Sequence, residues 1–352
     1  LSSRKHEDAV TMTSPLELMG APGSPYTRKM VALLRYRRIP YQVSWAAGRP
    51  PKPGYPVPKV PLLPTFYYPD GEGGMTAVTD STPIIRRLES EHEGCSVIPS
   101  DPVLSFLNDL IEDYADEWLT KAMFHFRWAH KADYDNAGPL LVYWSQNTLD
   151  AESAGKVSDA ISKRQFDRLY VVGSNDVTAK TIESSYARLI GILDVLLQKK
   201  GFVLGGRPSS ADFAIYGQLT QLAIVEPTSA AITVARSPRV RAWVDLMEDL
   251  SGLDPQEDDW FGADEAREAL APLLMEIGRV YAPFLIANAK AVMAGEKSFE
   301  TEIDGRAWTQ PSFPYQAKCL KWLREGYEAL SGNERGSVGA LLSGTGCETL
   351  FD

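Results

Sequence analysis

Short apolar runs alternate with a helical stripe at the start of the chain. The run LELM (16–19) is closed by turn-forming residues and predicts a buried strand. Apolar residues then recur at helical spacing between Pro25 and Pro40, which predicts a helix that ends before the second proline. The sequence YQVSW (41–45) predicts a second strand. The chain therefore begins with a β-α-β unit.

A proline-rich loop follows, and the pattern then resumes with a hairpin and a helix. LLPTFYY (62–68) and TAVT (76–79) predict two strands, and PDGEGG (69–74) between them has the composition of a turn. Asp80 and the residues after it carry the signals of a helix start. The order β-α-β, loop, β-β-α predicts a compact α/β domain of the thioredoxin-like type over residues 15–93.

Strand signals fade after this domain, and helical stripes replace them. Three stripes predict an all-helical second domain over residues 100–250, and they cover positions 104–118, 182–197 and 213–223. Ser209 and Asp212, just before the third stripe, have the spacing of a capping box. An unusually long segment, 119–181, separates the first two stripes.

The remaining residues, 251–352, have a pattern of their own and are predicted to form a mostly helical extension. A helix is expected over about 264–294, where the apolar stripe is too extensive for a free solvated helix and should pack on the helical domain. Asp304-Gly305 is typical of a tight hairpin turn, so a β-hairpin is expected near 298–309. A further helix should carry Cys319 and Leu323.

Charge and cysteine content narrow the class of partner. The net charge of the 352 residues is −10, which disfavours a nucleic acid or an anionic membrane surface as partner. The three cysteines have neither a disulfide nor a zinc-ligand spacing, so a reducing cytoplasm is expected.

Uninterrupted apolar runs of roughly 18 residues, which would favour a membrane span, are not found. Residues 1–14 are polar, unlike a signal peptide, and are expected to be a disordered tail or a cloning remnant.

A hydroxyl motif stands where the first helix begins. The sequence there is Gly23-Ser24-Pro25-Tyr26-Thr27. In glutaredoxins this turn is Cys-Pro-Tyr-Cys, and hydroxyl residues replace both cysteines here, which excludes dithiol redox chemistry at this position. The motif therefore offers a hydroxyl at a helix N-terminus. Backbone N–H groups and the helix dipole favour an anion at such a position.

Together with four further segments, this motif resembles the soluble glutathione transferases. The segments are Lys59-Val60-Pro61 before the third strand, Asp80-Ser81, RPSSADF (207–213) and SPRVRAWVDLM (237–247), and they occur in the family's order over about 16–248. The resemblance implies a glutathione-binding thioredoxin-like domain and a helical domain that holds a second, apolar substrate. It implies glutathione as co-substrate, no metal and a role in detoxification.

The resemblance also assigns roles to particular residues. Ser24 would hydrogen-bond the glutathione thiolate as the catalytic residue. Val60-Pro61 would supply the cis-proline and the exposed backbone that pairs with the tripeptide. Asp80 and Ser81 would hold the γ-glutamyl amine and carboxylate. A proline-rich loop, 46–58, replaces the helix that usually follows the second strand, and Lys59 is the candidate by charge for the glycine end.

Alternatives remain for each of these roles. Ser24 and Asp80 can both be helix caps only, and the whole chain can be a glutathione-binding or protein-interaction module without turnover. His125 and His130 are five residues apart, on different faces of a continuous helix, so they are interpreted as part of an aromatic face rather than as metal ligands. The acidic residues of 112–117 are interpreted as a solvated helix face.

The assembly is expected to be a homodimer, because the family resemblance and the need to bury apolar faces both favour one. The electrophilic substrate cannot be named from the sequence, since its pocket would come from the helical domain and the extension, which carry no motif.

Overall fold

The computed structural model describes residues 14–45 and 50–352, and it begins with a four-stranded sheet packed against two helices. The elements are β1 (Leu16–Met19), α1 (Pro25–Tyr36), β2 (Tyr41–Ser44), β3 (Thr65–Pro69), β4 (Met75–Val78) and α2 (Ser81–Glu91). The strand order is β2-β1-β3-β4, with β1 parallel to β2 and antiparallel to β3. This mixed sheet is the thioredoxin-like domain that the sequence predicts.

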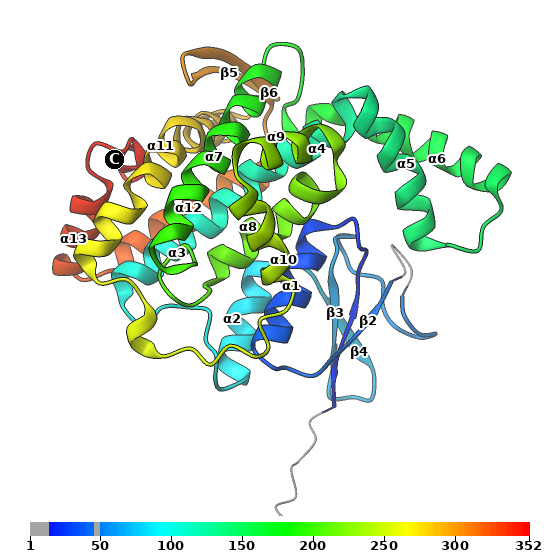
Figure 1. Cartoon of the computed structure of the whole chain (residues 1–352), viewed down its shortest axis with the longest axis horizontal. Helices are drawn as coiled ribbons and strands as arrows, with labels where there is room; N and C mark the ends of the chain where they lie inside the picture. Colours follow the sequence, from blue (N-terminus) through cyan, green and yellow to red (C-terminus); the bar gives the residue numbers. More distant parts are fainter. Residues whose placement is uncertain (1–13, 46–49) are drawn as a thin grey trace, which may run out of the picture.

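The second part of the chain is helical. Its elements are α3 (Pro102–Tyr114), a π-helical turn η1 (Ala115–Leu119), α4 (Thr120–Ala129), α5 (Lys131–Ser145), α6 (Ala151–Phe166), the 3-10 turn η2 (Leu169–Val172), α7 (Ala179–Lys200), α8 (Ser210–Thr220), a second π-helical turn η3 (Gln221–Val225), α9 (Pro227–Arg236) and α10 (Pro238–Met247). The long segment between the first two stripes therefore contains α4, α5, α6 and η2. Figure 1 shows α5 and α6 projecting from the body as an arm.

Helices α1 and α8 bring the two parts together at very short range. A Cβ atom at Gly217 of α8 would lie 2.5 Å from the Pro25 carbonyl oxygen and 3.0 Å from the Lys29 Cβ. Only glycine permits this approach. The capping box predicted at Ser209 and Asp212 is confirmed at the start of α8, with both reciprocal hydrogen bonds formed.

The extension packs on the helical domain, as its apolar stripe predicts. It contains the 3-10 turn η4 (Glu257–Asp259), α11 (Ala263–Ala294), β5 (Ser298–Ile303), β6 (Arg306–Pro311), α12 (Pro314–Ala329), α13 (Gly332–Leu342) and a last 3-10 turn, η5 (Cys347–Leu350). The strands form an antiparallel hairpin that turns at Asp304-Gly305. Phe284 of α11 lies fully buried beside Trp118 of η1 and Trp308 of β6, with ring centroids 5.8 and 6.3 Å away.

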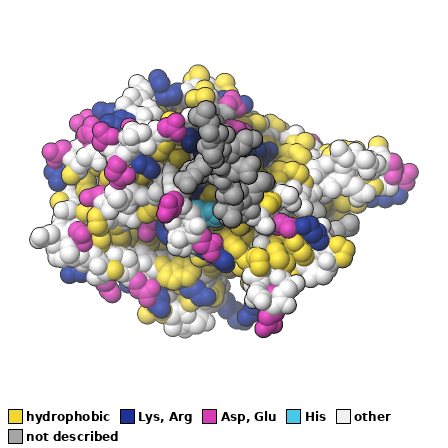
Figure 2. All heavy atoms as spheres, turned by 90° about the horizontal axis from the view of Figure 1, so that it is seen from below, with side chains coloured by type: hydrophobic (Ala, Val, Ile, Leu, Met, Phe, Trp, Pro, Cys, Tyr) yellow, Lys and Arg dark blue, Asp and Glu magenta, His cyan; other side chains and the backbone are white. Residues whose placement is uncertain are grey.

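Two features bear on whether a membrane or a strongly charged molecule could be a partner. By length and composition alone, α11 passes as a membrane-crossing helix, but 61% of its most apolar stretch is buried inside the folded chain. Burial of this kind is typical of a core helix. On the face of the molecule in Figure 2, basic and acidic side chains are interspersed among apolar ones.

Candidate functional site

A cavity of about 380 Å³ lies where the N-terminal ends of α1 and α2 face α3, η1 and α12. Its walls include Tyr26, Leu63, Pro64, Asp80, Ser81 and Tyr315. The first five belong to the thioredoxin-like domain, and the sixth belongs to the extension. The cavity therefore joins two parts of the chain that lie far apart in sequence.

Ser24 is the residue before α1 and caps its N-terminus. Its Oγ accepts a hydrogen bond from the Thr27 backbone N–H at 3.2 Å, in the extended conformation typical of an N-cap. The same hydroxyl lies 3.5 Å from the Leu63 carbonyl oxygen, which is long for an O–H donor. The capping role of Ser24 is thus present, and its proton has only a weak acceptor.

The cis-proline lies three residues later than the sequence comparison placed it. Among the described residues the cis peptide bond is Leu63-Pro64, so the expectation of a cis bond at Val60-Pro61 is wrong. Lys59, Val60 and Pro61 lie exposed in the loop before β3, whereas Pro64 is buried at the start of that strand. Because the apolar sequence around Pro64 resembles a strand, it gave no indication of a cis peptide bond there.

Asp80 and Ser81 begin α2, but Asp80 does not cap it. Asp80 has φ +82° and ψ 112°, a positive-φ conformation that is rare for residues other than glycine, and its carboxylate makes no capping hydrogen bond to the helix. The capping alternative for Asp80 is therefore wrong. Ser81 is buried, and its Oγ accepts a hydrogen bond from Lys29 at 3.1 Å. The carboxylate of Asp80 therefore accepts no hydrogen bond from the first N–H groups of α2.

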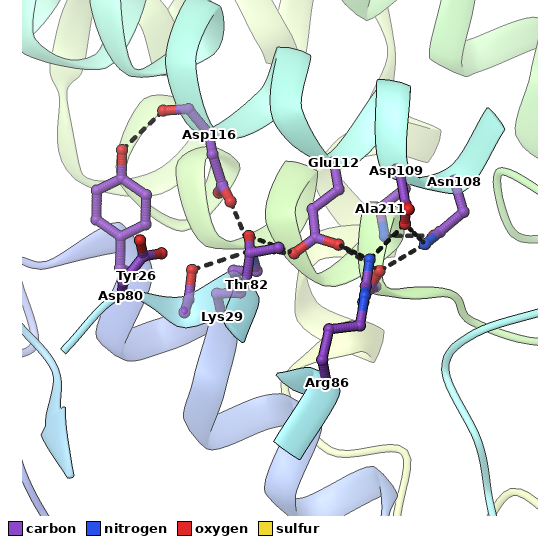
Figure 3. Close-up of polar contacts among 12 residues, drawn as sticks. Tyr26, Lys29, Asp80, Thr82, Arg86, Asn108, Asp109, Glu112, Asp116 and Ala211 are labelled. Atoms are coloured by element: carbon purple, nitrogen blue, oxygen red, sulfur yellow. Dashed lines mark hydrogen bonds and ion pairs between the residues drawn. The ribbon is translucent and has the colours of Figure 1, made fainter. Parts of the chain in front are cut away.

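Lys29 forms a buried ion-pair cluster beneath this helix start (Figure 3). Its Nζ lies 2.8 Å from Glu112 Oε1 and 2.6 Å from Asp116 Oδ2, and all three side chains are at most 10% exposed. The interpretation of 112–117 as a solvated face is therefore wrong. Burial alone would raise the pKa of Glu112, but Lys29 and Arg86 lower it well below its usual range. Asp116 keeps Oδ1 buried without a hydrogen-bond partner among the described residues.

Two further carboxyl groups on the same helical face meet the extension. Asp113 Oδ2 accepts a hydrogen bond from the Tyr281 hydroxyl at 2.6 Å, and Glu117 Oε2 accepts one from Gln316 at 3.2 Å. Burial raises the pKa of Asp113 to about 7. Burial and the neighbouring Asp113 and Asp116 raise the pKa of Glu117 to about 8.

The arm helix α5 reaches the turn that holds Ser24. A Cβ atom at Gly23 would lie 2.8 Å from Trp144 and 2.9 Å from Leu141, so glycine is required for this close contact. Arg127 also holds the turn, because it donates a 2.9 Å hydrogen bond to the Gly23 carbonyl. The segment 119–181 therefore places apolar side chains next to the first turn of α1.

A second cavity, of about 260 Å³, adjoins the first on the other side of Tyr315. The two share Thr82, Asp113 and Tyr315, and the second is also lined by Trp322 and Cys319 of α12. Sequence reasoning missed α12 as a wall of the site, because nothing in its composition links it to residues more than two hundred positions earlier.

His125 and His130 come together, although their spacing suggested opposite helix faces. Helix α4 ends at Ala129, and His130 is extended, so its ring turns back to lie 5.3 Å from the ring of His125. The spacing argument fails because it assumed a continuous helix.

Comparisons with known families match both halves of this architecture. A model of the glutathione S-transferase N-terminal domain matches residues 18–96, and a model of the C-terminal domain matches residues 162–246. No curated protein matches the chain.

The solved structures that the chain matches are distant in sequence. A Tau class glutathione S-transferase from mango, Mangifera indica, is 17% identical over 72% of this chain and 97% of its own, with a TM-score of 0.40. A glutathione S-transferase from Methylobacterium radiotolerans, in complex with glutathione sulfonate, is 17% identical over 69% and 99%, with a TM-score of 0.35. A family member from Pseudomonas fluorescens with bound S-(propanoic acid)-glutathione is 18% identical over 68% and 98%, with a TM-score of 0.33. Through its two matched domains, the chain belongs to the glutathione S-transferase family.

Proposed function

We propose that this protein is a glutathione transferase that activates the glutathione thiol for attack on an apolar electrophile. The observation that carries the proposal is the placement of the Ser24 hydroxyl at the start of α1, 3.5 Å from the carbonyl of Leu63, the residue before the cis-proline. These two groups lie beside the cavity that Asp80 and Ser81 line. A tripeptide with a thiol at its centre can reach all of them at once.

The γ-glutamyl end of glutathione fits the cavity by charge. Its ammonium group would lie toward Asp80 and Asp116, where Asp116 Oδ1 has no hydrogen-bond partner among the described residues. Its carboxylate would accept hydrogen bonds from Ser81 and the first N–H groups of α2, which also have the favourable end of the helix dipole. Lys29 donates a 3.1 Å hydrogen bond to the Ser81 Oγ, which leaves the Ser81 proton free for that carboxylate.

The thiol would then lie at the N-terminus of α1. The backbone of the cysteine would pair with Leu63, and the Ser24 hydroxyl would turn from its weak acceptor toward the sulfur. In the reaction, the thiolate forms a bond to an electrophilic carbon, and the bond to the leaving group breaks with its electron pair. Leu141 and Trp144 of α5 would form the apolar wall for that substrate. Lys59 remains the candidate for the glycine end, by its charge.

The alternative is a glutathione-binding or protein-interaction module without turnover. Two observations favour it: the Ser24 hydroxyl already caps α1, and the extension already contacts Asp80. Retention on immobilised glutathione, followed by conjugation assays with aryl halides, epoxides and aryl ethers, separates the two. Retention with turnover supports the transferase, and retention alone supports the glutathione-binding module. Passage through the column without retention contradicts both of these and leaves the protein-interaction module.

We further propose a cytoplasmic homodimer with a role in detoxification. Within one chain, α11 already packs on the apolar face of α7. The need to bury apolar faces is therefore a weaker argument for a dimer, and the expectation rests on the family. Light scattering at micromolar concentration tests it, and a particle with the mass of one chain would contradict it.

A further inference from the structure

Three possible metal ligands from two separate stretches of the helical domain meet at one point. His125 lies on α4, His130 follows its last residue, and Glu183 lies on α7 beside it. Glu183 Oε1 is 3.4 Å from His125 Nε2 and 3.2 Å from His130 Nε2. One ligand atom from each residue lies within 4.8 Å of the other two. The proposed glutathione chemistry uses none of these residues.

The two shorter distances match the edges of a zinc tetrahedron. Bonds of about 2.0–2.1 Å from Zn²⁺ to nitrogen and oxygen ligands place neighbouring ligand atoms about 3.3–3.4 Å apart at the tetrahedral angle. The edge between the imidazole nitrogens is at most 4.8 Å and is closed by a small rotation of one ring. His130 can make this rotation, because its side chain is 32% exposed.

Hydrogen bonding alone leaves the cluster incomplete. Both rings approach the same carboxylate oxygen, but only His125 has the geometry of a hydrogen bond to it. Nε2 of His130 is buried and has no hydrogen-bond partner in the described part of the chain. Buried polar atoms normally have a partner. A cation between the three side chains would use the lone pair of this nitrogen.

Ser174 orients the buried ring. Its Oγ lies 2.8 Å from His125 Nδ1, and the serine itself is buried. When Nδ1 donates its proton to this hydroxyl, Nε2 carries its lone pair toward Glu183. A hydrogen bond of this kind on the outer ring nitrogen accompanies nearly all metal-bound histidines, because it fixes the tautomer and the ring orientation.

We propose that His125, His130 and Glu183 bind a Zn²⁺ ion, with a water molecule as the fourth ligand. Two imidazoles with one carboxylate suit Zn²⁺, whereas Ca²⁺ and Mg²⁺ prefer oxygen ligands throughout. The side chains of His130 and Glu183 are about one third exposed, so the cluster lies near the surface. The ion would fasten the corner between α4 and α5, where the long segment 119–181 changes direction, to α7.

The test uses the full chain, freed of metal with a chelator and titrated with Zn²⁺ by calorimetry. We expect one equivalent to bind and to raise the melting temperature, since the ion binds only the folded state. Co²⁺ in its place should give the visible absorption of a tetrahedral site.

Matched variants locate the ion. His130→Gln and Glu183→Gln alter partly exposed side chains and should abolish the binding, while Ser174→Ala should weaken it about 10- to 100-fold. His6→Gln and His92→Gln, at the other two histidines of the chain, should leave it unchanged. Absence of binding by the parent protein, or unaltered binding by both the His130 and the Glu183 variants, would overturn the proposal. Glutathione plays no part in these measurements, so their outcome is independent of the transferase proposal.

Discussion

The hydroxyl of Tyr315 donates a 2.9 Å hydrogen bond to the carboxylate of Asp80, across 235 residues of sequence. Tyr315 lies in the first turn of α12, and Asp80 is the residue before α2. Both residues line the cavity that we assign to the γ-glutamyl end of glutathione. The extension is therefore part of the proposed site, because it holds the carboxylate that would bind the substrate ammonium.

Tyr315→Phe should weaken glutathione binding about 2- to 10-fold, the effect of one hydrogen bond that orients a carboxylate. The aromatic ring stays, so the wall of the cavity is preserved. Calorimetry gives the affinity, and Tyr327→Phe, which removes a hydroxyl from the same helix away from Asp80, is the control. Equal affinities of the two variants would show that the hydroxyl plays no part in binding.

Asp80→Asn should weaken glutathione binding by about 1.5–3 kcal/mol, because it removes the charge that pairs with the ammonium group. Asparagine has the shape of aspartate and therefore changes this position, at φ +82° and ψ 112°, less than alanine would. Since Asp80 makes no capping hydrogen bond, the melting temperature should hardly change. Glu93→Gln, at an exposed acidic residue of the same domain, controls for the lost charge. A large fall in melting temperature with unchanged affinity would contradict this assignment.

Glu117 should make the folded protein lose stability as the pH rises from about 4.5 to about 8. Burial and the neighbouring carboxylates raise the pKa of Glu117 to about 8 in the folded chain, so the folded state keeps a proton that the unfolded state releases in this range. The stabilisation is complete below the unfolded pKa and is lost as the pH rises through the folded one, with a slope of up to about 1.4 kcal/mol per pH unit.

Glu117→Gln cannot ionise and keeps a carbonyl oxygen for Gln316, so its stability should fall less over the same range. Urea unfolding at a series of pH values measures this slope. Glu325→Gln, at an exposed position of α12, should behave like the parent protein. Parallel profiles for the parent and Glu117→Gln would show that Glu117 ionises normally. Asp113, with a pKa of about 7, leaves part of the slope in every variant.

Local sequence was sufficient for the elements of the first domain and for the caps at Ser24 and Ser209, but not for Asp80. The strands and helices of the first domain follow from hydrophobic period and from turn residues, and the Ser209 capping box lies at the start of α8. These features depend on residues within a few positions of one another. The position of Ser24 at the start of α1 was predictable for the same reason.

Long-range partners were not predictable in this way. Glu112 and Asp116 resembled a solvated face, because the cation that neutralises them, Lys29, lies 83 and 87 residues away. Tyr315 carried no signal at all in its own helix. The cis bond at Pro64 was missed because a proline inside an apolar run gives no indication of its isomer. In each case the site depends on tertiary contacts, which residue patterns do not record.

Ser24→Ala should lower turnover 10- to 100-fold at pH 7 while leaving glutathione affinity within about tenfold, because the hydroxyl would act on the sulfur rather than on the rest of the tripeptide. A free thiol with a pKa near 8.5 is only a few per cent thiolate at pH 7, and the thiolate is the nucleophile. A hydrogen bond from Ser24 and the dipole of α1 together can lower that pKa by about two units, which corresponds to roughly 2.7 kcal/mol. Part of the lost turnover should therefore return at pH 9.

The control for this variant must separate catalysis from capping, since the Ser24 hydroxyl also accepts the Thr27 N–H. Ser331→Ala removes a serine cap of the same kind from α13, on the exposed surface of the extension. Both variants should lose about 1 kcal/mol of stability, the usual cost of an N-cap, but only Ser24→Ala should lose turnover. Titration of the bound thiol by its ultraviolet thiolate absorbance measures the pKa directly. If the thiol ionises at the same pH in the parent and in Ser24→Ala, the hydroxyl is a cap alone and another group must activate the sulfur.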